Sequence, residues 1–186
     1  MKQRDTLRIS DEMGKGGVIL CLAILLGACA SRVVETPPLP PPPRPPALIA
    51  VDFVLVDKSD RTLTLFGQGQ ALRIYPGLQF GDAPLGHKRF EGDERTPEGR
   101  YLLDYRNPDS AYHLSLHLSY PNAQDRAYAA SFGRSPGGQI FIHGQPNGVD
   151  ERIRGDWTDG CIALSNAEIE EIWRFVPDGT LIEIRP

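Results

Sequence analysis

From residue 53 onward, apolar and polar positions are arranged in short runs typical of β-strands: residues 53–57 are almost continuously apolar, like an inner strand, and residues 62–66 alternate. Glycine-rich turns such as residues 67–70 separate the runs. The predicted strands cover residues 53–57, 62–66, 71–75, 99–105, 112–120, 139–142, 161–164 and 181–185. Many short strands separated by turns predict a mostly β domain, either a β-sandwich or an open barrel.

One segment follows helical periodicity instead. Ser165 and Glu168 have the spacing of a capping box, in which both side chains bond to the backbone at the start of a helix. Apolar side chains then recur at helical spacing, at Ile169, Ile172, Trp173 and Val176. Pro177-Asp178-Gly179 ends the segment. We therefore expect one short helix in the C-terminal region, with its apolar stripe packed on the core.

Near the N-terminus, residues 18–26 form an uninterrupted apolar run, too short to cross a bilayer and of the length of a signal-peptide core. The run leads into Leu26-Gly27-Ala28-Cys29, which resembles a bacterial lipobox. We expect residues 1–28 to be a lipoprotein signal peptide and Cys29 to carry the lipid; an ordinary secretory signal is the alternative. Acidic residues precede Met13, which makes Met13 a second candidate for the true start.

A proline-rich stretch follows, at residues 36–46. Proline lacks the amide donor and fixes φ, so this stretch is expected to be an extended polyproline II spacer. Residues 29–48 are then a tether and residues 49–186 the folded domain. Ala30 and Ser31 lack the acidic residue that resembles an inner-membrane retention signal, which favours the periplasmic face of an outer membrane. A docking role for the prolines is the alternative.

The charge balance excludes some partners. Residues 49–186 hold 14 Lys and Arg against 20 Asp and Glu, a net charge of −6. Nucleic-acid binding needs a basic face, so no nucleic-acid partner is expected.

No metal or other cofactor is expected either. His113 and His117 are four residues apart, but on a strand this is about 13 Å, too far to share an ion.

Cysteine usage points to chemistry. Cys21 lies in the removable segment and Cys29 would carry lipid, which leaves Cys161 without a disulfide partner. A free thiol in an oxidising compartment is a liability unless it is used. This argues that Cys161 is reactive.

Cys161 follows Gly160, and His143 precedes Gly144, eighteen positions away. A thiol attacks acyl groups as the thiolate, and an imidazole can take its proton and return it to a leaving amine. Gly160 lets a substrate carbonyl approach the backbone and leaves N–H groups for an oxyanion. These residues predict a Cys–His acyl-transfer pair; a buried structural cysteine and a satisfied strand histidine are the alternative.

His143, the spacer and Thr158-Asp159-Gly160-Cys161-Ile162 resemble the signature of the L,D-transpeptidase (YkuD-type) family of bacterial cell-wall enzymes. The resemblance covers about residues 50–186 and includes Gly86-His87-Lys88 and the stretch 92–99. It implies that Cys161 is the nucleophile, that His143 is its base, and that a carbonyl near Gly144 fixes the imidazole tautomer. It also implies a mostly β fold.

Two positions depart from the family pattern. Asp159 stands where His is common, and Ala163 stands where Arg or Asn is common. Neither position is the nucleophile or the base, so the departures affect the expected substrate contacts. Asp159 is expected either to orient a substrate ammonium or to fix the turn, and its charge to raise the pKa of Cys161. An adjacent His143 imidazolium is expected to lower that pKa well below its usual value.

The loop between the two candidate catalytic residues carries Arg152 and Arg154. Peptidoglycan stem peptides have free carboxylates, which guanidinium groups bind in bidentate fashion. Both arginines, together with Thr158 and Asp159, are therefore candidate substrate-binding residues. Two solvated loop arginines are an equal alternative.

The expected function is a cysteine-dependent L,D-transpeptidase that forms an acyl-enzyme on Cys161 with a peptidoglycan stem peptide and passes it to an acceptor amine. The diaminopimelate centre of the donor is implied by the resemblance. Two alternatives remain open at this point. One is a hydrolase that uses the same site, and the other is a lipoprotein that binds peptidoglycan without catalysis.

Overall fold

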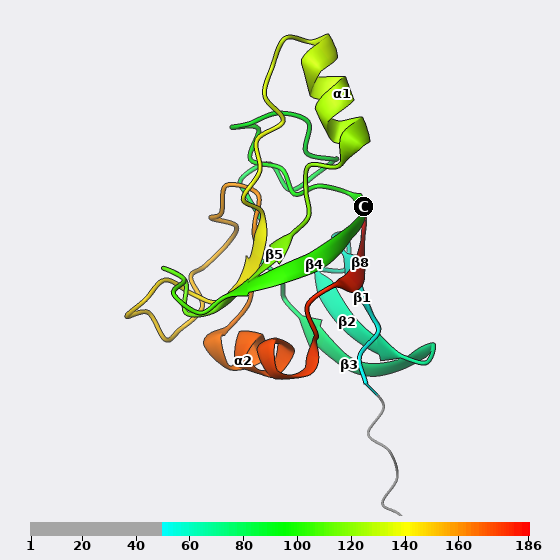
Figure 1. Cartoon of the computed structure of the whole chain (residues 1–186). Helices are drawn as coiled ribbons and strands as arrows, with labels where there is room; N and C mark the ends of the chain where they lie inside the picture. The colour runs from blue at the N-terminus through cyan, green and yellow to red at the C-terminus, as the bar shows by residue number, and fades with distance from the viewer. Residues whose placement is uncertain (1–49) are drawn as a thin grey trace, which may run out of the picture. The chain divides into compact units, whose positions relative to one another are not determined.

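The computed structural model describes residues 50–186, so the lipobox, Cys29 and the proline-rich stretch lie outside the described residues. Eight strands form one mixed sheet that curls into a half-barrel (Figure 1). They are β1 (Phe53–Asp57), β2 (Thr62–Gly67), β3 (Gln70–Pro76), β4 (Gly99–Asn107), β5 (Ser115–Leu118), β6 (Phe141–His143), β7 (Ile162–Ala163) and β8 (Thr180–Arg185). Two short helices, α1 (Ala123–Ser131) and α2 (Asn166–Phe175), complete the described part. The prediction of a mostly β, open-barrel-like fold is confirmed.

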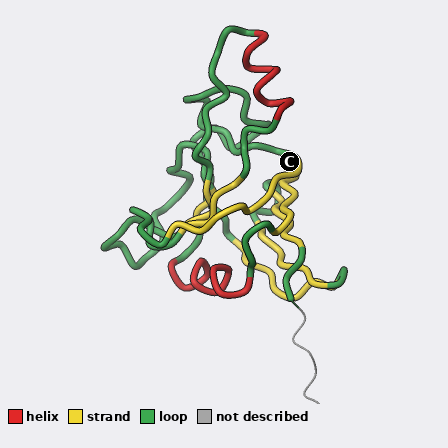
Figure 2. The backbone as a smooth tube through the Cα atoms, in the orientation of Figure 1, coloured by secondary structure: helices red, strands yellow, loops and turns green. Residues whose placement is uncertain are grey.

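The strand order is β3-β2-β1-β8-β4-β5-β6-β7. Strands β1, β2 and β3 form the expected antiparallel meander. The last strand, β8, lies between β1 and β4 and runs parallel to β1, so the C-terminal segment sits in the middle of the sheet. At the other end of the sheet, β6 and β7 pair in parallel; His143 is the last residue of β6, and Cys161 directly precedes β7. Figure 2 shows the strands and the long loops that connect them.

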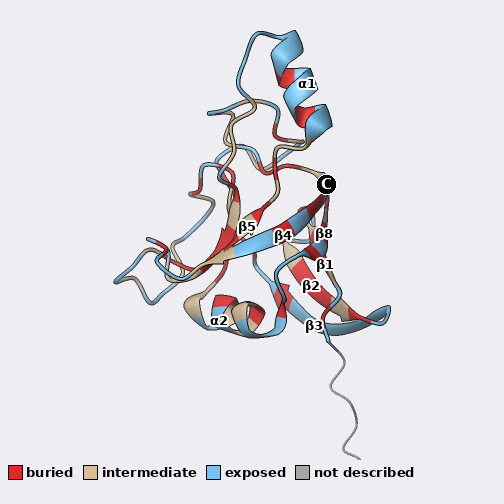
Figure 3. Ribbon diagram, in the orientation of Figure 1, coloured by how far each residue is buried: buried red, intermediate tan, exposed pale blue. Residues whose placement is uncertain are grey.

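The core lies on the concave side of the sheet, where alternate strand residues are buried. Fully buried side chains include Val54, Leu63, Leu103, Ile142, Ile162 and Ile182. Each such side chain contributes roughly 1.5–3 kcal/mol of transfer free energy. Helix α2 covers this side with Ile169 and Ile172, and its buried stripe is visible in Figure 3.

Helix α2 begins at the capping box predicted from Ser165 and Glu168. Helix α1 was not predicted, because it lacks an apolar stripe and buries only Asp125 and Ala129. Its sequence signal is a second capping box, formed by Asn122 and Asp125. The Asp125 carboxylate also accepts a hydrogen bond from the Tyr101 hydroxyl, which joins α1 to the sheet.

Strand β5 is shorter than the predicted strand 112–120, because His113 adopts a left-handed backbone with φ of 65°. The His113 ring pairs with Glu170 at 2.8 Å, and the His117 ring pairs with Asp104 at 2.7 Å. The two histidines thus have separate partners. Within residues 50–186, no group of three metal-ligating side chains is present, and no helix is long and apolar enough to cross a membrane.

Candidate active site

Cys161 and His143 line the same cavity, which has a volume of about 450 Å³. Its walls come from three parts of the chain: the β4–β5 connection around Tyr112, the segment from Gly138 to His143, and the segment from Trp157 to Cys161. The predicted pair is therefore brought together, along with Thr158 and Asp159. Gly144, Gly160, Arg152 and Arg154 are not in the lining.

The sheet register explains why both side chains face the cavity. Strands β6 and β7 pair in parallel, with Ile142 opposite Ile162 and His143 opposite Ala163. Both isoleucines are fully buried in the core. Extending this register by one residue places Cys161, directly before β7, opposite Phe141, two residues before His143. Because side chains alternate between faces along a strand, His143 and Cys161 share the opposite face.

A hydrogen bond fixes the ring of His143. Its Nδ1 lies 2.6 Å from the carbonyl oxygen of Gly144. A carbonyl only accepts, so Nδ1 carries the proton and Nε2 keeps its lone pair. The amide of Gly144 in turn donates to the carbonyl oxygens of Tyr112 and Leu114. This is a carbonyl contact of the kind that the family resemblance implied near Gly144.

Two aromatic rings enclose the imidazole. The Tyr112 ring lies 4.6 Å from the His143 ring, centroid to centroid, and the Trp157 ring lies 5.6 Å from it. His143 is only 3% exposed as a result. Burial lowers the pKa of His143 to about 4, although the Gly144 hydrogen bond acts in the opposite direction. The imidazole is therefore neutral at neutral pH and can act as a base.

The Cys161 thiol is held by backbone groups. Within the described residues, its sulfur accepts from the Phe141 amide at 3.4 Å and donates to the Gln139 carbonyl at 3.6 Å, and it forms no hydrogen bond with His143. Burial raises the pKa of Cys161, and the Asp159 charge adds to this, as expected, while the Phe141 amide and Lys88 oppose it.

The structure thus corrects one expectation, that an adjacent imidazolium lowers the pKa of the thiol. The sequence cannot show that His143 is buried and Cys161 half-buried, and burial disfavours the charged form of both groups. The resting pair is a neutral thiol beside a neutral imidazole. Proton transfer from Cys161 to His143 then belongs to the reaction itself.

The turn before the nucleophile is tightly built. Gly160 has φ of +117°, and a Cβ there would lie 2.5 Å from the Arg95 carbonyl oxygen, so only glycine fits. The Thr158 hydroxyl accepts from the Gly160 amide at 3.3 Å and donates to the Cys161 carbonyl at 2.8 Å. Thr158 therefore shapes the turn as well as lining the cavity.

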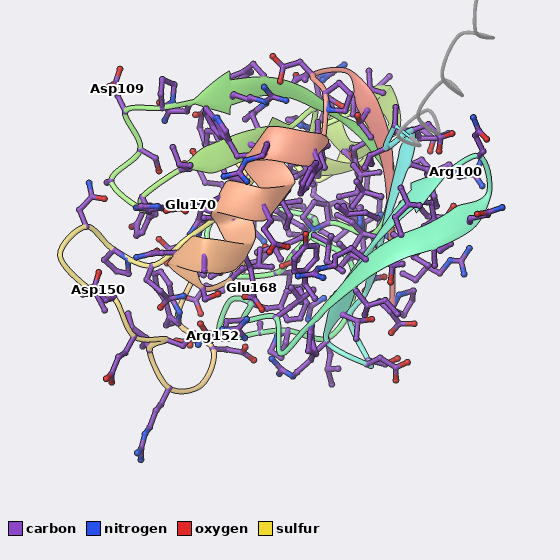
Figure 4. The ribbon with its side chains drawn as sticks, turned by 90° about the horizontal axis from the view of Figure 1, so that it is seen from below. Arg100, Asp109, Asp150, Arg152, Glu168 and Glu170 are labelled. Carbon is purple, nitrogen blue, oxygen red and sulfur yellow. The ribbon has the colours of Figure 1, made fainter. Side chains whose placement is uncertain are left out.

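The arginines of the loop lie elsewhere. Arg152 pairs with Glu168 at the start of α2, as Figure 4 shows, and also donates to the carbonyl oxygens of Pro76 and Gly77. Arg154 is exposed. Neither side chain lines the cavity, so the structure does not bring them to Cys161 as carboxylate ligands. Among the lining residues, Asp159 alone has a carboxyl group, and none is a lysine or an arginine.

The other departure from the family pattern is explained by packing. Ala163 is fully buried, and its backbone forms two hydrogen bonds with Gln79, of 2.9 and 3.0 Å.

Sequence reasoning missed the aromatic residues Tyr112 and Trp157. Trp157 stands directly before Thr158 in the motif, but Tyr112 is 31 positions before His143, and only the β4–β5 connection brings it to the imidazole.

Comparisons with known proteins match the described domain to one family. The model of the L,D-transpeptidase catalytic domain (YkuD) matches residues 52–184. YafK of Escherichia coli (strain K12), named as an L,D-transpeptidase by inference, is 29% identical over 181 residues, which cover 91% of this chain and 67% of YafK.

Two solved structures resemble the domain. The helical cell shape determining protein Pgp2 from Campylobacter jejuni is 30% identical, with a TM-score of 0.58 over 72% of this chain and 47% of Pgp2. Bd1075 of Bdellovibrio bacteriovorus is 29% identical, with a TM-score of 0.51 over 73% of this chain and 48% of that protein. The matched region is about half the length of each of these structures.

Proposed function

The chain belongs to the L,D-transpeptidase catalytic domain family, and from this premise we propose that it transfers acyl groups of peptidoglycan stem peptides through a thioester on Cys161. The observation that carries the proposal is the shared cavity of Cys161 and His143, with Nδ1 of His143 bound to the Gly144 carbonyl. This tautomer leaves Nε2 as the basic ring nitrogen of His143, in the cavity that Cys161 also lines. A purely structural histidine would not need a fixed tautomer in a cavity that also holds a free cysteine.

Acylation begins with a proton transfer. Nε2 of His143 takes the thiol proton as the Cys161 sulfur attacks the carbonyl carbon of an L-centre residue in the donor peptide. The resulting oxyanion accepts a hydrogen bond from the Cys161 amide. The C–N bond then breaks, and the His143 imidazolium gives its proton to the departing amine. The product is a thioester with a neutral imidazole.

Transfer reverses these roles. An acceptor amine enters the cavity, loses a proton to Nε2 of His143 and attacks the thioester carbonyl. The C–S bond breaks, and the imidazolium returns its proton to the sulfur. Asp159 is suited to hold an ammonium group of either peptide, because it is the one Asp or Glu residue in the lining. Diaminopimelate, which carries such a group, is the proposed donor centre.

We also propose that the domain works at the cell envelope, attached through lipid on Cys29 and a tether of residues 29–48. The support is the sequence Leu26-Gly27-Ala28-Cys29 after a short apolar run. Replacing Cys29 with Ala should move the protein out of the membrane fraction or block its maturation. Recovery of the unaltered protein in the soluble periplasmic fraction, without lipid on its N-terminal peptide, would contradict the anchor.

The decisive experiment incubates the protein with purified muropeptides and identifies the products by mass spectrometry. Transfer predicts new crosslinks between two L-centres, or exchange of an added D-amino acid into the stem, together with a thioester on Cys161. Cys161→Ser is the matched control, because it keeps the side-chain size but is far harder to ionise.

The same experiment distinguishes the alternatives. Shortened stems or cleaved crosslinks without exchange, through the same thioester, would identify a hydrolase that delivers water in place of the amine. Muropeptide binding without a thioester or any new product would identify a non-catalytic peptidoglycan-binding protein. Either result would overturn the transpeptidase proposal.

A further inference from the structure

A buried hydroxyl holds the peptide unit that precedes the nucleophile. Thr96 is fully buried, and its Oγ1 donates a hydrogen bond of 2.9 Å to the carbonyl oxygen of Gly160. The two residues are 64 positions apart in the chain. This contact therefore depends on the tertiary fold and lies directly behind Cys161.

Because the peptide unit is planar, this contact also fixes the direction of the Cys161 N–H. In a trans peptide the N–H points opposite to the C=O. The Gly160 carbonyl points at Thr96, so the amide N–H of Cys161 points away from Thr96. Among the hydrogen bonds of the described residues, none uses this N–H.

The neighbouring backbone groups are already engaged. The Gly160 amide and the Cys161 carbonyl both bond to the Thr158 hydroxyl, and the Gly160 carbonyl bonds to Thr96. The Cys161 amide is thus the donor left over next to the sulfur. Since Thr158, Asp159 and Cys161 line the cavity, the available side of this peptide is the cavity side.

We propose that Thr96 is a positioning residue for acyl transfer: its hydroxyl orients the Gly160–Cys161 peptide so that the Cys161 amide donates to the oxyanion. The assignment rests on the proposed role of Cys161 as nucleophile. Thr96 itself touches neither the substrate nor the reacting atoms. It acts through the Gly160 carbonyl.

The loop that carries Thr96 is rigid enough for this task. Its centre is the Asp93 carboxylate, which accepts the backbone amides of Arg89, Phe90 and Arg95 and the ammonium group of Lys88. Lys88 is itself buried, and its amide bonds to the Thr96 carbonyl at 3.3 Å. These bonds hold the backbone on both sides of Thr96, so its hydroxyl has a defined position.

The test compares three variants of the full chain. Thr96→Val removes the hydroxyl and keeps the branched shape, and Thr96→Ser keeps the hydroxyl. Thr180→Val is the matched control, because Thr180 is also buried and its Oγ1 also donates to a carbonyl, that of Pro177 at 2.7 Å, but this carbonyl does not belong to the peptide unit that precedes Cys161. The readouts are the rate of thioester formation with a stem tetrapeptide and the rate of thiol alkylation by iodoacetamide.

Thr96→Val should slow thioester formation at least about 10-fold with the KM changed less than about twofold, because a misaligned donor weakens only oxyanion stabilisation. Alkylation involves no oxyanion and should stay at the wild-type rate. Thr96→Ser should restore most of the acylation rate, and Thr180→Val should not lower it. Wild-type acylation by Thr96→Val, or an equal loss of alkylation that Thr96→Ser fails to restore, would overturn the assignment.

A substrate-free measurement separates this assignment from the proposed function. The ¹H–¹⁵N resonance of the Cys161 amide should move in Thr96→Val and return in Thr96→Ser. If the unaltered protein forms no thioester, the proposed function fails. The amide resonance then still decides the structural half of the inference, and an unmoved resonance would reject it.

Discussion

Nδ1 of His143 lies 2.6 Å from the carbonyl oxygen of Gly144, the next residue in the chain. The contact fixes the ring with Nε2 unprotonated, without the carboxylate partner that orients many catalytic histidines. A neutral acceptor does not stabilise an imidazolium as a carboxylate would, which agrees with the lowered pKa of His143. The base is therefore neutral at rest and ready to accept the thiol proton.

The first prediction concerns the thiol. Because burial and the charge of Asp159 raise the pKa of Cys161, alkylation by iodoacetamide should increase with pH about a midpoint above the roughly 8.5 of a free thiol. Asp159→Asn removes the negative charge that raises the pKa of Cys161 and should lower the midpoint. Rates measured across a pH series on the two proteins check both statements.

Asp150→Asn is the control for that series. Asp150 is an exposed carboxylate of the same loop, and it does not line the cavity. Its removal changes the net charge by the same amount and should leave the midpoint in place. A wild-type midpoint well below that of a free thiol would show instead that a thiolate–imidazolium pair exists at rest.

The second prediction concerns stability at acidic pH. The unfolded chain protonates His143 near its ordinary value of 6.5, whereas the folded protein does so only near pH 4. Between these values the unfolded state binds more protons, so the free energy of unfolding falls as the pH drops from about 6.5 to 4. The loss attributable to His143 is on the order of 3 kcal/mol.

His143→Gln should remove this part of the pH dependence. Urea unfolding of both proteins at several pH values between 4 and 7 measures it, because every other group titrates alike in the two proteins. Near pH 7 and above, the difference in unfolding free energy between the unaltered protein and His143→Gln should no longer change with pH. Parallel stability curves across the whole range would contradict the lowered pKa of His143.

The sequence predicted the sheet well because its signals are local. Short apolar or alternating runs indicated the eight strands, and the Ser165–Glu168 capping box indicated helix α2. The order of the strands is a different matter. The insertion of β8 between β1 and β4 depends on pairings between distant segments, which leave no periodic trace in the sequence. Helix α1 was missed because it packs through only two buried residues.

The site was predictable where its residues form a motif and unpredictable where they meet through the fold. His143 and Cys161 were found because each stands beside a glycine in a recognisable stretch. The contact of Thr96 with Gly160 and the stacking of Tyr112 on His143 both join distant segments. Arg152 and Arg154 were candidate substrate ligands, with solvated loop arginines as the equal alternative, because the sequence cannot show that Glu168 binds Arg152.

The third prediction tests that reassignment. Arg152→Ala should lower the free energy of unfolding by about 1–3 kcal/mol, because it leaves Glu168 without its cation and removes bonds to the Pro76 and Gly77 carbonyls. Thiol alkylation should be unchanged. Arg154→Ala, in the same loop and exposed, should cost no more than about 0.5 kcal/mol. If Arg152→Ala left stability intact but weakened binding of stem peptides, the carboxylate clamp would be the better interpretation.

The last prediction separates two reasons for glycine before the nucleophile. Gly160 and Gly148 both have positive φ, +117° and +85°, but a Cβ at Gly148 meets nothing within 4 Å, whereas at Gly160 it meets the Arg95 carbonyl oxygen at 2.5 Å. Gly148→Ala should therefore cost only the backbone strain, about 1–2 kcal/mol.

Gly160→Ala should cost at least about 2 kcal/mol more than Gly148→Ala, because two backbone segments must also move apart. The movement would carry the Gly160 carbonyl away from Thr96 and with it the Cys161 amide, so thioester formation should be lost while Gly148→Ala retains it. Urea unfolding and mass spectrometry of the thioester measure the two effects. Equal stability losses in the two variants, with acylation intact in Gly160→Ala, would mean that the close approach of Arg95 is unimportant and that positive φ alone requires glycine at position 160.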